Sequence, residues 1–162
     1  VKRACGPGAA DGLPVDTALA MEDAAILAGS AWKPVARLDV CPAPAVPPVA
    51  VPAGVLRLAL VLLLCRVSRA IAALAGPDRE PGRIELAARR SGEGIVLTLA
   101  WAGAIPLAGT WTQTLDAGLT ALLSRHGIAW DRLEPAGGDG PDEVVILELP
   151  CRSLGALRST PG

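Results

Sequence analysis

The stretch LALVLLLCRVSRAI, residues 58–71, is the most apolar run in the chain and decides between a membrane anchor and a core helix. Arg57 and Arg66 bracket eight apolar residues, which rise about 12 Å as a helix. The hydrocarbon core of a bilayer is about 30 Å thick. A segment long enough to cross it would bury Arg57, Arg66 and Arg69 in lipid, which is costly. The stretch therefore predicts a buried helix of a water-soluble domain and no membrane span.

The composition indicates one domain with an aliphatic core. The chain has 162 residues, the size of a single ordinary domain. Hydrophobic residues make up 51% but aromatic residues only 2%, with four Trp and neither Phe nor Tyr. The core must therefore be built from Ala, Val, Leu and Ile. The net charge of −1 offers no basic excess, which argues against nucleic acid as a partner.

Cysteine usage argues against a structural metal site. The four cysteines stand at positions 5, 41, 65 and 151, without a CxxC pair, and the chain has one His. A zinc site needs such ligands in closer spacing, so we expect no metal. We interpret the thiols as reduced, in a cytoplasmic protein, with disulfides as the open alternative. The residues VKRACGPGAADG at 1–12 lack the apolar core of a secretory signal.

Periodicity and turn residues predict an ordered domain over 15–150, with flexible tails at 1–14 and 151–162. The predicted elements are a helix at 15–29 that begins at Asp16 and ends at Gly29, a strand at 34–40, an extended proline-rich connector at 41–54, a helix at about 53–75, strands at 82–89 and 94–101, a helix at 115–127, and strands at 128–134 and 143–150. Strands joined by short turns are antiparallel. The order therefore predicts a two-layer α/β sandwich, in which helices cover one face of a mixed, mostly antiparallel sheet.

This order resembles the ATP-binding domain of sensor histidine kinases, the Bergerat-fold (GHKL) family shared with gyrase-type and chaperone-type ATPases. The resemblance covers about residues 15–150 and rests on order and spacing. The segment VPPVAVPAGVLRLALVLLLCRVSRAI (46–71) is similar to the family's proline-containing segment and the helix that carries its asparagine motif. GRIELAARRSGEGIVLTLAWAGAIP (82–106) stands in place of a hairpin and an Asp-x-Gly-x-Gly box. LDAGLTALLSRHGIAWDRLEPAGGDGPDEVVILELP (115–150) resembles the family's Gly-Leu helix, glycine turn and last two strands.

Within this resemblance, the magnesium site is degenerate. The family's asparagine that helps hold magnesium on the phosphates falls at Cys65, and an earlier asparagine falls at Val61. The acidic partners on that helix fall near Val67, Ser68 and Arg69, and the chain contains no asparagine at all. A neutral thiol is a poor ligand for magnesium, which takes hard oxygen donors. Arg69 would repel the metal.

The adenine box and the lid are reduced as well. Where the family has the aspartate that accepts the adenine amino group, this chain has Trp101 or Ala100, and the second glycine of the box is Ala104. The lid over the phosphates would lie between Gly103 and Gly118, fifteen residues apart, which is short for a lid. The resemblance therefore implies a degenerate nucleotide pocket with the following equivalents: Val61, Cys65, Arg69, Trp101, Gly103 and Gly118.

Other candidate residues have structural explanations, so we assign no catalytic residue. Cys65 follows three leucines and suits a buried small hydrophobe. His126 precedes Gly127 and suits a helix C-terminus, where a cation is favourable, better than a phosphoacceptor. Trp101 and Trp111 leave two alternatives open, since they either fill the space of the adenine or form a contact surface.

Three functions stay open. The first is a degenerate kinase-like ATPase domain that docks on proteins in bacterial two-component or phosphorelay signalling, as in alphaproteobacterial histidine phosphotransferases, without ATP hydrolysis. Its partner would be a response regulator, a kinase or a second copy in a homodimer, and it would need no cofactor. The second is an active ATP-binding kinase domain with ATP and magnesium, for which Asp78, Glu80 and Asp116 are the nearby carboxylates. The third is a small structural or interaction domain unrelated to kinases.

Overall fold

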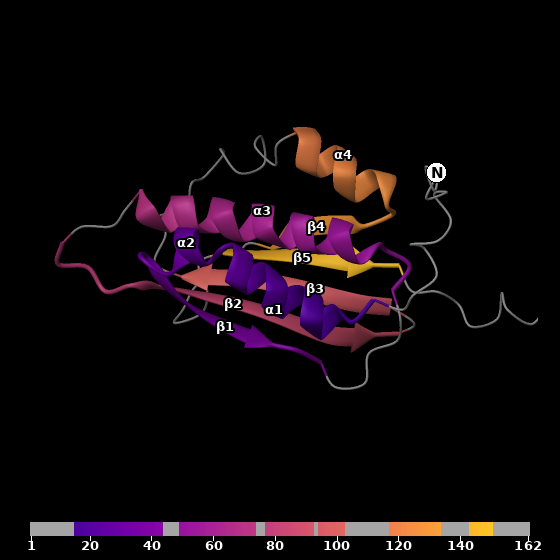
Figure 1. Cartoon of the computed structure of the whole chain (residues 1–162), viewed down its shortest axis with the longest axis horizontal. Coiled ribbons are helices and arrows are strands. Elements are labelled where there is room, and N and C mark those ends of the chain that lie inside the picture. The colour runs from indigo at the N-terminus through magenta and orange to yellow at the C-terminus, as the bar shows by residue number, and fades with distance from the viewer. Residues whose placement is uncertain are drawn as a thin grey trace, which may run out of the picture.

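A five-stranded mixed sheet with helices on one face organises the chain (Figure 1), which confirms the predicted α/β sandwich. The computed structural model describes residues 15–43, 49–73, 77–92, 94–102, 117–133 and 143–150, and both predicted tails lie outside these ranges. The helices are α1 (Thr17–Leu27), α2 (Gly29–Trp32), α3 (Ala53–Ala72) and α4 (Ala117–Arg125). The strands are β1 (Ala36–Cys41), β2 (Gly82–Ser91), β3 (Gly94–Ala102), β4 (Ala129–Leu133) and β5 (Glu143–Leu149).

The sheet has the order β1-β2-β3-β5-β4. Only β1 and β2 are parallel among these strands, and α3 lies between them in the sequence, as a parallel crossover requires. The pairs β2–β3, β3–β5 and β4–β5 are antiparallel. The predicted hairpins, 82–89 with 94–101 and 128–134 with 143–150, are therefore confirmed as β2–β3 and β4–β5.

The first helix begins as predicted but ends differently. Asp16 caps α1, because its Oδ1 accepts a hydrogen bond from the Leu19 amide at 3.1 Å. The predicted end at Gly29 is wrong, since α1 ends at Leu27 and Gly29 begins the short helix α2. The indole N–H of Trp32 donates to the Ala25 carbonyl oxygen at 2.8 Å, which ties α2 back to α1.

The apolar face of α3 is buried, as the sequence predicts. Leu56, Leu60, Leu63 and Leu64 are each at most 1% exposed and belong to the core. One polar side chain lies on this face, Ser68, and its hydroxyl donates to the Leu64 carbonyl oxygen at 2.6 Å. Intrahelical bonds of this kind allow a serine to be buried inside a helix. Across the ranges that the structure describes, no helix has the length and apolar character needed to cross a membrane.

A glycine allows α3 to lie close to the sheet. A Cβ at Gly82, the first residue of β2, would lie 2.8 Å from Cγ2 of Ile71. Any other residue would push the end of α3 away from the sheet. Gly127 has a different role, because its φ of +68° lies in the left-handed region that favours glycine. It follows α4 as predicted and turns the chain into β4.

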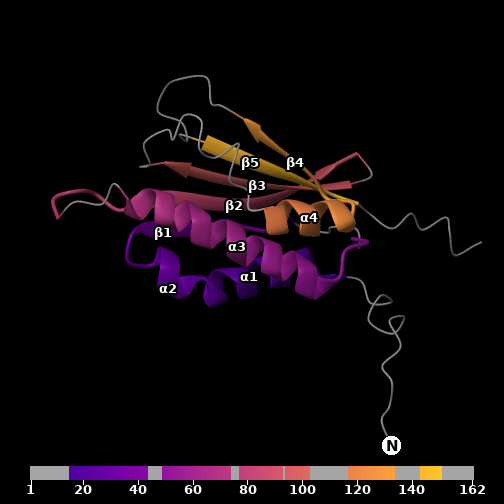
Figure 2. The same ribbon diagram turned by 90° about the horizontal axis from the view of Figure 1, so that it is seen from above.

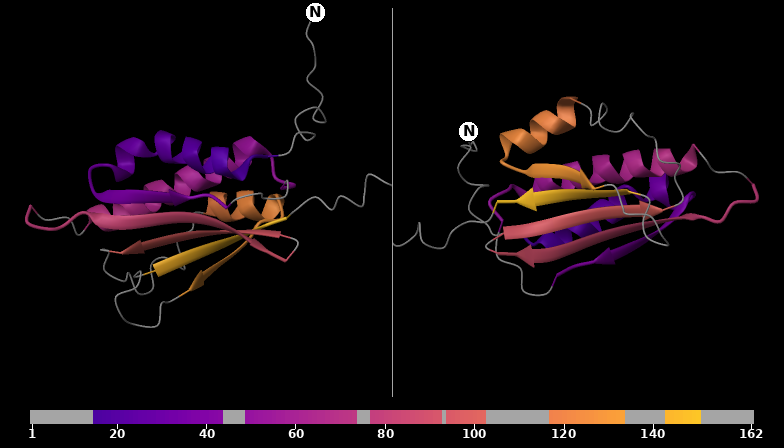
Figure 3. Two further views of the ribbon diagram at one scale, coloured as in Figure 1. Left: turned by 90° about the horizontal axis from the view of Figure 1, so that it is seen from below. Right: turned by 180° about the vertical axis from the view of Figure 1, so that it is seen from behind.

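Helices cover one face of the sheet, and the other face is open. Views from above and below show α1, α3 and α4 on the same side of the strands (Figures 2 and 3). Side chains alternate along each strand, and the inward positions of β2 and β3 include Ile84, Leu86, Leu97 and Leu99, all buried. On β1, Arg37 and Asp39 are exposed on the open face.

Replacing Leu63 by alanine tests the packing of α3. Leu63 is fully buried, so we expect Leu63→Ala to lower the free energy of unfolding by about 2–5 kcal/mol through lost burial and a residual cavity. Urea denaturation measures this change. Leu62→Ala is the matched control, because Leu62 is the next residue of the same helix and is 38% exposed. Equal losses in both variants would contradict the orientation of α3.

Candidate functional site

Three of the residues predicted for the degenerate pocket share one face of α3. Val61, Cys65 and Arg69 follow each other at intervals of four, which places them in a single row along the helix. Val61 and Cys65 are half-buried and pack against the core, and Arg69 is exposed in the last turn. The row therefore offers two apolar contacts and one cation, with no oxygen ligand.

The donors on α3 do not fit a magnesium ion. The twenty residues of this helix include no Asn, Asp, Gln, Glu or His. The hydroxyl of Ser68 is the one side-chain oxygen, and it is buried and bonded to the helix backbone. Magnesium needs several oxygen ligands in octahedral geometry. Across the described residues, no three His, Cys, Asp or Glu side chains gather where they could hold a metal ion.

The carboxylates considered for an active kinase do not supply those ligands. Asp78 and Glu80 are exposed in the segment between α3 and β2. Glu80 lines a hollow together with Arg37 and Asp39, on the open face of the sheet and away from the row on α3. Asp116 lies outside the described residues.

Trp101 lies in the core beneath the helices. It is 1% exposed on the helix-facing side of β3, where its register partners are Ile84 on β2 and Glu143 on β5. Its ring therefore contributes to the core at the point where the sequence places the adenine-binding aspartate of the family. Gly103, Ala104 and Trp111 lie outside the described residues.

Gly118 is placed in the same layer as α3. It lies in the first turn of α4 and is exposed, and α4 packs beside α3 (Figure 2). The structure thus brings the predicted residues of α3 and α4 into one helix layer, with Trp101 buried below it. His126 lies directly after α4 and is half-buried, and its backbone amide donates to the Leu123 carbonyl oxygen.

A buried ion pair near Trp101 was missed by the sequence analysis. Arg132 on β4 donates through Nη2 to Oε1 of Glu143 on β5, and the two side chains are only 12% and 5% exposed. Both residues occupy helix-facing positions, because Arg132 pairs with Val145 and Glu143 pairs with Trp101. The pair therefore places the Glu143 carboxylate, bonded to Arg132, opposite Trp101 on the neighbouring strand.

The sequence carried a weak signal for this pair. Arg132 stands two positions after Trp130, so strand alternation places it inward with that half-buried ring. A buried charge needs a partner. The partner could not be identified from the sequence, because the four residues that follow Glu143 on β5 are all apolar. Without alternation, the sequence does not show which face of this strand points inward.

The fold is shared with solved catalytic domains of histidine kinases. A mycobacterial sensor histidine kinase, MprB, matches over 88% of this chain and 100% of its own, with a TM-score of 0.59 and 15% identity. The catalytic domain of the histidine kinase ThkA matches over 86% of this chain and 96% of its own, with a TM-score of 0.60 and 17% identity. Full-length ShkA in complex with AMPPNP matches over 87% of this chain and 31% of its own, with a TM-score of 0.59 and 20% identity.

These matches establish the fold, and sequence comparisons add nothing to them. No protein-family model and no curated protein sequence matches the chain. The chain therefore has the fold of the histidine-kinase catalytic domain, as the resemblance implied, at identities too low to carry over a function.

Breaking the buried ion pair should destabilise the protein. We expect Glu143→Ala to lower the free energy of unfolding by about 3–5 kcal/mol, because it leaves the charge of Arg132 buried without its partner. The double variant Arg132→Met/Glu143→Leu should lose much less, since it removes both charges. Urea denaturation of the single and double variants measures the difference.

A surface pair provides the control for this measurement. Arg57 on α3 and Asp23 on α1 form an ion pair of 3.2 Å, with side chains 40% and 34% exposed. Asp23→Ala should cost about 0–1 kcal/mol. A loss at Glu143 no larger than the loss at Asp23 would contradict the buried position of the Arg132–Glu143 pair.

Alkylation rates test whether Cys65 is a reactive thiol. Cys41 on β1 is exposed, and Cys65 packs against the core. We therefore expect iodoacetamide to modify Cys41 faster than Cys65 in the folded protein, followed peptide by peptide with mass spectrometry. In urea the two rates should become similar. Faster modification of Cys65 than of Cys41 in the folded state would support a reactive thiol.

Proposed function

We propose that this chain is a degenerate histidine-kinase-type ATPase domain that serves as a protein-docking module in bacterial two-component or phosphorelay signalling, without ATP hydrolysis. One observation carries the proposal: a histidine-kinase catalytic fold is combined with a helix α3 that offers no side chain able to hold magnesium. In phosphoryl transfer the metal neutralises charge that develops on the phosphates. A domain without metal ligands at this place keeps the scaffold and loses the chemistry.

The exposed surface of the helix layer supports a docking role. Apolar side chains reach solvent from two neighbouring helices: Leu19, Ile26 and Leu27 on α1, and Leu58 and Leu62 on α3, between 38% and 76% exposed. Single exposed apolar residues are common on monomeric proteins, and a contiguous group of them would favour a contact with another protein. The Arg57–Asp23 pair joins the same two helices.

The class of partner follows from the same proposal. A domain of this fold in a phosphorelay would contact a response regulator, a kinase or a second copy of itself, in the cytoplasm where those proteins act. The absence of a basic excess, with a net charge of −1, gives no support to a nucleic-acid partner.

Nucleotide binding is the experiment that tests the proposal. We expect calorimetry with ATP or ADP at millimolar concentration to give no heat of binding, either with or without magnesium. Thermal unfolding should agree, because a ligand at 100 times its dissociation constant would stabilise the fold by about 2.7 kcal/mol. ShkA, solved with AMPPNP, is the positive control for the titration.

Magnesium-dependent binding would overturn the proposal. It would mean that residues outside the described ranges, such as Asp116, complete a metal site that α3 lacks. The chain would then be an active ATP-binding domain, and transfer of phosphate from ATP to a histidine would be the next measurement.

A further inference from the structure

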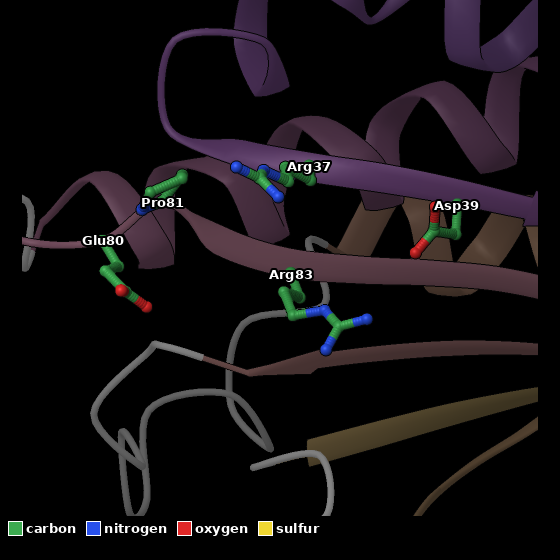
Figure 4. A pocket seen from close by; sticks show the side chains of 5 residues that line it. All are labelled: Arg37, Asp39, Glu80, Pro81 and Arg83. Atoms are coloured by element: carbon green, nitrogen blue, oxygen red, sulfur yellow. The ribbon is translucent and has the colours of Figure 1, made fainter.

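The open face of the sheet contains a charged hollow that the proposed docking role does not use. It has a volume of about 560 Å³ and is lined by Arg37 and Asp39 of β1, Arg83 of β2, and Glu80 and Pro81 just before β2 (Figure 4). This volume falls within the range of small-molecule and peptide-side-chain sites. The hollow lies on the side of the sheet away from α3, so it is separate from the row of Val61, Cys65 and Arg69.

Strand register sets the two arginines side by side. In the parallel pair β1–β2, Arg37 lies opposite Arg83, and Ala36 and Gly82, the residues before them, are buried toward the helices. Neighbouring strands are about 4.8 Å apart. In Figure 4 the two side chains start near the middle of the hollow, and their guanidinium groups turn toward opposite ends, that of Arg37 toward Pro81 and Glu80 and that of Arg83 toward Asp39.

Each of these arginines lacks an ion pair within the described part of the chain. Like charges directly opposite each other on a sheet are destabilising, and the next row repeats the arrangement, because Asp39 lies opposite Glu85. Each guanidinium has five N–H donors in a planar fork that suits carboxylate and phosphate oxygens. An oxyanion placed between Arg37 and Arg83 would turn this repulsion into two charge-assisted interactions.

We propose that the hollow binds an oxyanion, a carboxylate or a phosphate group, between Arg37 and Arg83. The hollow is larger than a free phosphate needs, so the oxyanion is carried by a larger molecule. Asp39 and Glu80 at the ends exclude further negative charge and favour a positive group next to the oxyanion. The site does not depend on the nucleotide experiment, because it shares no residue with α3.

Titration with two probes tests this site on the full chain. Inorganic phosphate and the blocked peptide acetyl-Glu-Lys-amide, which carries one carboxylate beside one positive group, are added at constant ionic strength, and NMR shifts of the β1 and β2 amides and of the arginine side chains are followed. We expect saturating shifts at the hollow with one or both probes. Binding of phosphate alone would identify a phosphate-bearing ligand, and binding of the peptide would identify a carboxylate-bearing one.

Matched variants show whether the two arginines make the site. Arg37→Gln and Arg83→Gln should each weaken binding at least tenfold. Arg89→Gln should bind as the unchanged protein does, because Arg89 is exposed on the same strand and face as Arg83 but does not line the hollow. Thermal unfolding of Arg37→Gln and Arg83→Gln, compared with that of the unchanged protein, reports whether each variant is folded.

Two results would overturn the proposal. One is the absence of saturating shifts with both probes at tens of millimolar, or equal shifts when potassium chloride replaces them. The other is binding that persists unchanged in Arg37→Gln and Arg83→Gln. Since the melting measurement reports folding of each variant, loss of binding in a folded variant is attributed to the lost guanidinium.

Discussion

The apolar face of α3 lies on the sheet, and the other elements are arranged around that contact. Leu56, Leu60, Leu63 and Leu64 are at most 1% exposed there, and each buried leucine contributes about 1.5–3 kcal/mol. The chain has neither Phe nor Tyr, so this contact depends on branched aliphatic side chains and on close approach. Gly82 provides that approach at the far end of the helix, where Ile71 would collide with a side chain on β2.

The same contact is compatible with the loss of the nucleotide site that we propose. The side chains that hold α3 on the sheet and the row of Val61, Cys65 and Arg69 occupy different faces of one helix. Val61 and Cys65 are half-buried against the core and Arg69 is exposed, so this row contributes less buried surface than the leucines do. One fold commonly hosts unrelated functions, so a histidine-kinase fold without nucleotide chemistry is physically reasonable.

Most elements could be predicted from local patterns, and the features that involve distant partners could not. The β2–β3 hairpin follows from two alternating runs around a glycine turn, and the end of α4 follows from Gly127, whose φ is positive. The end of α1 was misplaced, because Gly29 continues into a helix that Trp32 holds in place. The row on α3 was predictable from its spacing of four.

Which residues of two neighbouring strands lie opposite each other depends on the register of the strands, and local sequence patterns do not specify that register. Arg132 and Glu143 meet because β4 and β5 pair in one register, and a shift by one residue would turn both side chains to the other face. Arg37 and Arg83 are separated by a whole crossover, and their approach depends on the parallel pairing of β1 with β2. The position of β5 between β3 and β4 was likewise not specified by any local pattern.

The position of β1 at the end of the sheet has a consequence for self-association. Its outer edge presents backbone N–H and C=O groups, which in other proteins add a strand from a neighbouring molecule. Arg37 and Asp39 place a positive and a negative side chain two residues apart along this edge, both exposed. Charged side chains on an edge strand oppose the addition of another strand. The charges on β1 therefore help to keep the sheet at five strands when many copies of the protein are present together.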